Sequence, residues 1–250
     1  MKVREILAKS ILNKSFIGDY CINPYIGCLH ACNYCYAYYY TRKIYGIDER
    51  WGSYVLIKYN AINLLKKEIL KKDRGIVYLS SLTDSYQPIE KKYSMTRKIL
   101  ELLLKHNYPL IIQTKSTLIL RDFDLIKEFE NSQIGFTIVT LDEKIRKKIE
   151  PLASPSIERI NVLRRFHEEG IKTFAFIGPI LPFTPIEKIA EIVDMVSFSD
   201  RIYFDKFNYK PGLEKMVEKT WLSEEVKKYY EKIGKDLKEK FDGKKFVHLF

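Results

Sequence analysis

Three cysteines that lie close together in the chain are the residues best suited to chemistry. Cys28, Cys32 and Cys35 follow a C-x3-C-x2-C spacing within one short segment. Three thiolates on a single loop suit an iron-sulfur cubane, whose four irons require four ligands, so one iron would be left open to a small molecule. The spacing therefore predicts a reactive 4Fe-4S cluster.

A structural zinc site is the main alternative for these cysteines. Zinc normally takes four protein ligands from two separated pairs, whereas this chain has one compact group, and His30 lies inside the same loop. A disulfide framework is disfavoured because four cysteines are too few for 250 residues and no secretory apolar segment opens the chain. We therefore expect reduced thiols in a cytoplasmic protein.

Length and charge set broad limits on the protein. A chain of 250 residues without a linker, repeat or long apolar run fits a single domain over residues 1–250 with no membrane partner. The net charge of +11 suits a nucleic acid or an acidic electron carrier as partner. A composition rich in Lys, Ile and Glu, as in heat-adapted proteins, is an equal explanation of the charge.

Short apolar runs alternate with helical patterns after the cysteines, which predicts a parallel α/β fold. With the segment that enters the cysteine loop, six strands are predicted. The other five cover residues 76–82, 109–115, 133–140, 172–177 and 201–207. Helices are expected near residues 95–103, 122–130, 157–170 and 186–196. The predicted fold class is a partial (β/α)6 parallel barrel.

Polar residues and a glycine follow the ends of these strands, where parallel barrels place their active sites. They are Thr83, Asp84, Lys115, Ser116, Thr137, Thr140 and Gly178. We expect them to face the cysteine loop.

An ordered series of motifs accompanies the cysteines. It comprises Asn23-Pro24-Tyr25-Ile26-Gly27 before Cys28, the run Leu82 to Glu90, Thr114-Lys115-Ser116, Arg121-Asp122, and Glu150 to Pro155 followed by Arg159. This series, with an aromatic residue directly before the third cysteine, resembles the spore photoproduct lyase-like branch of the radical S-adenosylmethionine (SAM) superfamily, often labelled DNA repair photolyase-like. The resemblance implies a radical SAM core over residues 15–210 and a helical extension over residues 211–250.

The resemblance also implies cofactors and ligands. Cys28, Cys32 and Cys35 would hold a 4Fe-4S cluster, and SAM would occupy its fourth iron. One-electron reduction of SAM would yield a 5'-deoxyadenosyl radical that abstracts hydrogen. Lys115 matches the position whose ammonium group pairs with the SAM carboxylate.

Weaker assignments complete the cofactor site. Asp84 would receive the SAM ammonium group, shape its pocket or cap a turn. Thr137 or Thr140 would contact the ribose, and the backbone at Gly178 would contact adenine. The tyrosines on either side of Cys35, Tyr34 and Tyr36, are included as cofactor contacts, with packing as the alternative role. Glu150 and Arg159 are expected to form at least a structural ion pair.

The implied protein is a radical SAM enzyme with an unidentified substrate, for which nucleic acid is one candidate, and with a flavodoxin-like or ferredoxin-like one-electron donor. The alternative is a non-catalytic iron-sulfur or zinc protein that binds nucleic acid or a protein partner. Only the enzyme requires SAM-contacting residues that converge with the three cysteines.

One position departs from the resemblance. Spore photoproduct lyase carries a hydrogen-donating cysteine just before the segment equivalent to Thr83-Asp84, where this chain has Ser81. A hydroxyl O–H bond is too strong to replace a thiol in hydrogen donation, so we expect SAM cleavage without thymine-dimer repair. The fourth cysteine, Cys21, is expected to be buried and to lie outside the cluster ligand set.

Overall fold

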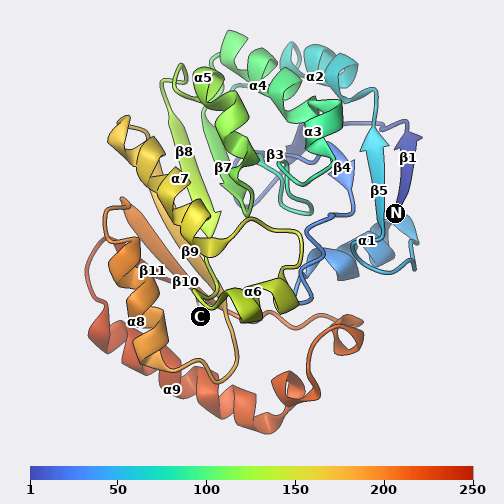
Figure 1. Cartoon of the computed structure of the whole chain (residues 1–250). Helices are drawn as coiled ribbons and strands as arrows, with labels where there is room; N and C mark the ends of the chain where they lie inside the picture. Colours follow the sequence, from blue (N-terminus) through green and yellow to red (C-terminus); the bar gives the residue numbers. More distant parts are fainter. Residues whose placement is uncertain (250) are drawn as a thin grey trace.

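The computed structural model, which describes residues 1–249, places the six predicted strands side by side in one sheet (Figure 1). In spatial order they are β3 (Tyr20–Ile22), β6 (Val77–Leu79), β7 (Leu110–Thr114), β8 (Ser132–Thr137), β9 (Lys172–Ile180) and β10 (Arg201–Lys206). Every neighbouring pair is parallel. The predicted α/β fold, an open partial barrel, is confirmed.

Both edges of this sheet carry a strand that the sequence patterns did not predict. β11 (Phe246–His248) pairs in parallel with β10, so the C-terminal extension contributes a strand as well as a helix. β2 (Asn13–Lys14) pairs antiparallel with β3 at the opposite edge. Two or three residues are too few to show the period-2 alternation by which a strand is recognised.

A second, three-stranded sheet was also not predicted. It consists of β1 (Lys2–Ile6), β5 (Tyr54–Lys58) and β4 (Tyr25–Ile26), in the order β1-β5-β4. β4 pairs antiparallel with β5 immediately before the cysteine loop. The small sheet therefore fixes the point at which the chain enters that loop.

Helices connect the strands and pack against the sheet (Figure 1). They are α1 (Ala37–Tyr45), α2 (Ala61–Ile69), α3 (Glu90–Tyr93), α4 (Met95–Lys105), α5 (Phe123–Ile126), α6 (Glu143–Ile149), α7 (Ser156–Glu168), α8 (Ile186–Met195) and α9 (Glu224–Lys240). The buried residues of α7 include Ile160, Leu163 and Phe166, whereas Ile157, in its first turn, is exposed. None of the helices within residues 1–249 combines the length and apolar character that crossing a bilayer requires.

The prediction of one helix over residues 122–130 is wrong. The chain makes a 3-10 helix over Thr117–Asp122 and then the single turn α5. Asp122, at the junction, is fully buried, and its carboxylate contacts Arg97 at 3.2 Å and Arg121 at 2.7 Å. These tertiary contacts hold the junction in a shape that the apolar pattern does not reveal.

Candidate active site

A cavity of about 580 Å³ lies between the cysteine loop and residues at the carboxyl ends of the strands. Its volume lies within the range typical of small-molecule and cofactor sites. Of the twelve residues predicted to contact the cofactors or to face the cysteine loop, ten line it: Cys28, Cys32, Tyr34, Cys35, Tyr36, Thr83, Asp84, Lys115, Thr137 and Gly178. The fold thus brings together residues separated by 150 positions in the sequence. Ser116 does not line the cavity, and its hydroxyl accepts a hydrogen bond of 3.3 Å from the Leu118 amide instead.

The start of the cysteine loop depends on a glycine and two polar side chains. Gly27 has a φ of +87°, and a Cβ atom there would lie 2.6 Å from the Tyr54 carbonyl oxygen, so only glycine fits. Its own carbonyl accepts hydrogen bonds from Thr83 Oγ1 at 2.7 Å and Gln87 Nε2 at 3.2 Å. Gln87 Oε1 also accepts from the Leu29 amide at 2.8 Å. The motif after β6 therefore holds the loop around Cys28.

The end of the loop is held by the motif that contains Glu150. The Tyr34 hydroxyl donates to one carboxylate oxygen of Glu150, and Arg159 Nη2 donates to the other at 2.6 Å. Both charged side chains are fully buried. The Asn33 amide adds a hydrogen bond of 3.0 Å to the Ile149 carbonyl. The predicted ion pair thus positions the segment between Cys32 and Cys35.

The three thiols fit an iron-sulfur cluster by donor type and surroundings. Cys28 and Cys32 are buried and Cys35 is partly buried. Burial raises the pKa of Cys35 to about 11, against the opposing effect of the Lys115 cation. A metal that binds thiolate would offset this cost of deprotonation.

No three thiol, imidazole or carboxylate side chains among residues 1–249 converge on a single metal ion. In a cubane each thiolate binds a different iron, so such convergence is not required.

Lys115 is fixed by its backbone and leaves its ammonium group free. Its amide donates to Asp84 Oδ2 at 2.9 Å, and its carbonyl accepts from the Ser154 amide at 3.0 Å. Burial lowers the pKa of Lys115, but Cys32, Glu150 and other anionic groups raise it above its usual value. No residue within 1–249 forms a hydrogen bond or ion pair with its Nζ. A permanent cation therefore lies at the cavity wall beside the cysteines.

The carboxylate of Asp84 is already engaged by the protein. Oδ1 accepts from Thr114 Oγ1 at 2.7 Å and from the Tyr86 amide at 2.8 Å, in addition to the Lys115 contact on Oδ2. His30 Nδ1 lies 3.3 Å from Oδ2. Burial raises the pKa of Asp84, but His30 and Lys115 outweigh it and hold this pKa well below its usual range. These contacts favour a pocket-shaping role over direct contact with the SAM ammonium group.

The imidazole of His30 is buried against the first cysteine and Asp84. Burial lowers the pKa of His30, but the Asp84 carboxylate and Cys28 raise it to about 9. The protonated His30 ring therefore pairs with the negative charge of Asp84 beneath the cysteine loop.

Thr137 and Thr140, the two candidates for ribose contact, have different surroundings. Thr137 lines the cavity, and its hydroxyl accepts a hydrogen bond of 2.9 Å from Gln113 Nε2. Thr140 is not among the lining residues, and its hydroxyl accepts from the Asp142 amide at 3.1 Å. β8 ends at Thr137, so Thr140 lies in the following loop. The structure therefore distinguishes the two threonines by their position: Thr137 lies at the cavity and Thr140 lies away from it.

Gly178 lines the cavity where β9 passes beneath an aromatic ring. A Cβ atom at this position would lie 2.2 Å from Cε1 of Phe176. The Phe176 ring therefore occupies the space that a side chain would need, and Gly178 contributes only main-chain atoms to the cavity wall.

Sequence reasoning missed a polar chain that crosses three strands on the cavity wall. The Tyr78 hydroxyl donates to Gln113 Oε1 at 2.7 Å, and Gln113 in turn donates to Thr137. The available signal was the polar Gln113 directly after the apolar residues Leu110 to Ile112 of β7. Asp205 and Lys206, at the end of β10, also line the cavity and were not predicted.

Cys21 and Ser81 are neighbours. Cys21 is buried and donates a hydrogen bond of 3.2 Å to Ser81 Oγ. Ser81 lines the cavity, whereas Cys21 does not. Ser81 therefore lies between the Cys21 thiol and the cavity.

These features define the class of the protein. The family model of the radical SAM superfamily matches residues 22–196, and the chain belongs to this superfamily. It is an enzyme of a family that uses a 4Fe-4S cluster and SAM, and the cysteine loop and cavity described above lie largely within the matched region.

The chain is also similar to several other proteins and solved structures. An uncharacterized protein of Methanocaldococcus jannaschii is 39% identical over 86% of this chain and 81% of its own length. An uncharacterized protein of Acidianus two-tailed virus is 32% identical over 95% and 81%. Spore photoproduct lyase complexed with dinucleoside spore photoproduct has the same fold, with a TM-score of 0.69 at 14% identity, over 99% of this chain and 82% of that one. Streptococcus suis SuiB bound to S-adenosylmethionine follows with a TM-score of 0.60 at 15% identity, over 92% and 50%.

Proposed function

We propose that this protein holds a 4Fe-4S cluster through Cys28, Cys32 and Cys35 and cleaves SAM reductively to start chemistry on a substrate. The observation that carries the proposal is the convergence of the three thiols and the unpaired Lys115 ammonium group on one cavity. When bound, the cluster supplies the electron for this cleavage. A non-catalytic iron-sulfur protein would not need the Lys115 site.

The residues of the chain bind and orient SAM. Lys115 pairs with the SAM carboxylate, because an ammonium group fixed beside the cysteines can form a charge-assisted hydrogen bond there. Asp84 positions Lys115 and His30. Thr137 contacts the ribose and Gly178 the adenine, and Tyr34 and Tyr36 close the wall next to Cys35. Thr140 is assigned no cofactor contact.

The cavity walls also protect the reaction from water. Aromatic side chains of the lining, among them Trp51, Phe174, Phe176 and Tyr203, surround the space with apolar surface. Exclusion of water limits side reactions of a radical. A flavodoxin-like or ferredoxin-like protein is the proposed electron donor.

The substrate is proposed to be a nucleic acid. The fold of spore photoproduct lyase, the basic charge of the chain and the partly open cavity support this choice. Repair of the spore photoproduct is not expected, because Ser81 faces the cavity where that activity would need a thiol.

Anaerobic reconstitution tests the proposal. The protein, loaded with iron and sulfide and reduced with dithionite, is expected to convert SAM to 5'-deoxyadenosine and methionine in equal amounts. The Cys32→Ala variant serves as the control and should give neither product. A wild-type protein that carries the cluster but forms no 5'-deoxyadenosine would contradict the proposed function.

A further inference from the structure

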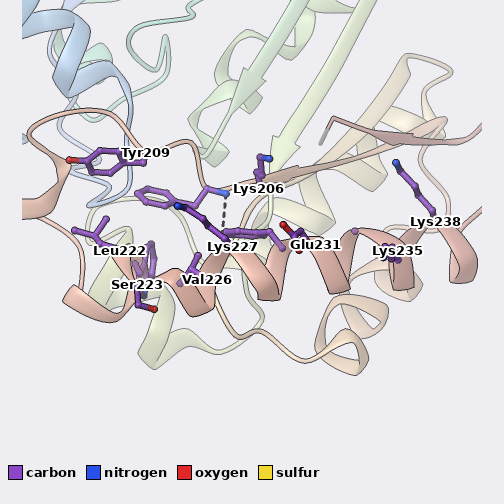
Figure 2. A pocket seen from close by; sticks show the side chains of 13 residues that line it. Lys206, Tyr209, Leu222, Ser223, Val226, Lys227, Glu231, Lys235 and Lys238 are labelled. Atoms are coloured by element: carbon purple, nitrogen blue, oxygen red, sulfur yellow. Dashed lines mark hydrogen bonds between the residues drawn. The ribbon is translucent and has the colours of Figure 1, made fainter.

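A second concave site lies along α9, outside the cysteine cavity. It has a volume of about 770 Å³, and its charged lining residues are Lys206, Lys227, Glu231, Lys235 and Lys238. Phe207, Tyr209, Trp221 and Leu222 belong to its apolar lining. We call this site the α9 groove. Figure 2 shows Lys227, Lys235 and Lys238 in succession along the helix, with Lys206 across from them.

The lysines of the α9 groove are available to a ligand. All four are exposed, and Lys206, Lys235 and Lys238 form no ion pair with any residue from 1 to 249. Lys227 pairs with Glu224 at 2.8 Å, but both side chains are more than 70% exposed, so this pair contributes little stability. With one carboxylate against four ammonium groups, the groove complements an anionic ligand.

The groove borders the cysteine cavity. Lys206 lines both sites, and its neighbour Asp205 lines the cavity. A ligand that follows the lysines of α9 toward Lys206 would therefore arrive at the cavity mouth. This continuity points to a long anionic substrate that occupies both sites at once.

We propose that the α9 groove binds the single-stranded nucleic-acid segment next to the reacting nucleotide. The inference rests on the proposed function and deepens it by giving the substrate strand a path to the cavity. Lys227 to Lys238 span about 16 Å along a helix, a length over which a single strand presents several phosphates. The lysines contact phosphates, and aromatic rings of the lining stack on bases.

The aromatic lining favours a nucleic acid over an acidic protein. Single-stranded nucleic acids are bound by basic grooves that also present aromatic rings for stacking. Tyr209 is 47% exposed, and the ring of Trp221 packs edge-on against Phe207 with centroids 5.4 Å apart. An acidic electron carrier would use the lysines but would have no need of exposed rings within a trough.

Fluorescence anisotropy with a labelled single-stranded DNA of twelve nucleotides tests the proposal on the full-length chain. The triple variant K227Q/K235Q/K238Q removes three phosphate contacts, so we expect affinity to fall about tenfold and the slope of log K against log salt to shrink by about two. The matched control is K66Q/K67Q/K105Q, whose exposed lysines lie on α2 and α4 at the opposite side of the molecule (Figure 1). The control should bind as the wild type does.

A second pair of variants tests base stacking. Tyr209→Ala removes the ring and should weaken binding about tenfold. Tyr209→Phe keeps the ring and loses only the hydroxyl contact to Glu214, so it should bind normally. Circular dichroism and thermal unfolding show whether each variant is folded.

Several outcomes would contradict nucleic-acid binding in the α9 groove. These are wild-type protein that does not bind the oligonucleotide, a triple variant that binds like the control, and equal affinities for Tyr209→Ala and Tyr209→Phe. A triple variant that loses affinity for an acidic flavodoxin but not for DNA would overturn it in favour of a protein partner. Because anisotropy does not depend on SAM cleavage, oligonucleotide binding without 5'-deoxyadenosine formation supports the groove and contradicts only the proposed function.

Discussion

The cysteine cavity and the α9 groove both present lysines to a ligand, but they hold them in different ways. Lys115 in the cavity is fixed by hydrogen bonds to both of its backbone groups, from two motifs distant in sequence. Lys235 and Lys238 in the groove extend from the exposed face of α9, and their side chains form no hydrogen bond or ion pair with any residue from 1 to 249. The backbone of Lys115 is therefore held in one position, whereas the lysine side chains of the groove are free to change conformation when a ligand binds.

This difference has an energetic consequence. Substitutions beneath the cavity break buried, hydrogen-bonded charges, so they affect folding and chemistry together. Substitutions in the groove change exposed charges, which contribute little to folding. A residue in or beneath the cavity is therefore best compared with one outside it.

The largest expected effect is the complete loss of the cluster. Cys32→Ala should abolish the visible absorbance of the reconstituted protein and its bound iron, because three thiolates are the minimum ligand set. Cys21→Ala should keep both, since Cys21 lies behind Ser81 and outside the cavity lining. A Cys21 variant without a cluster, or a Cys32 variant with an unchanged one, would refute the ligand assignment.

Next in size is the loss of stability when the buried ion pair is broken. Glu150→Gln leaves the Arg159 charge buried without its partner, which should cost about 3–5 kcal/mol in the free energy of unfolding. Glu191→Gln breaks the exposed pair with Lys188 and should cost less than about 1 kcal/mol. Denaturant unfolding of the two variants gives the comparison. Equal losses of unfolding free energy in the two variants would show that the buried Glu150–Arg159 pair stabilises the fold no more than an exposed pair does.

Loss of the cavity cation should weaken SAM binding. Lys115→Met removes one charge-assisted hydrogen bond to the SAM carboxylate, so KM for SAM should rise roughly 10- to 100-fold. Lys144→Met, on the exposed face of α6, provides the control and should leave KM unchanged. Steady-state formation of 5'-deoxyadenosine measures both values. A KM for Lys115→Met within twofold of the wild type would remove Lys115 from the SAM site.

The smallest effect separates the two threonines. Thr137→Val removes a hydroxyl from the cavity wall and should raise KM for SAM about 2- to 10-fold, the range of a single neutral hydrogen bond. Thr140→Val should leave KM within twofold of the wild-type value, because Thr140 does not line the cavity. The opposite order would restore Thr140 as the ribose contact.

Sequence patterns predicted the central sheet because each strand of β6 to β10 contains apolar residues within a short segment between helical patterns. They also predicted the cysteines and Lys115, whose spacing and motif context are local. They could not separate Thr137 from Thr140, since that difference depends on where β8 ends. The α9 groove was missed as well, because its members combine a helix face with Lys206 and Tyr209 from preceding segments.

The electron paramagnetic resonance spectrum of the reduced, reconstituted protein tests the central claim most directly. If the three cysteines leave one iron open inside the cavity, SAM should bind that iron and change the spectrum in proportion to the SAM added, and the change should require higher SAM concentrations in Lys115→Met. A spectrum that stays the same at saturating SAM would contradict the account.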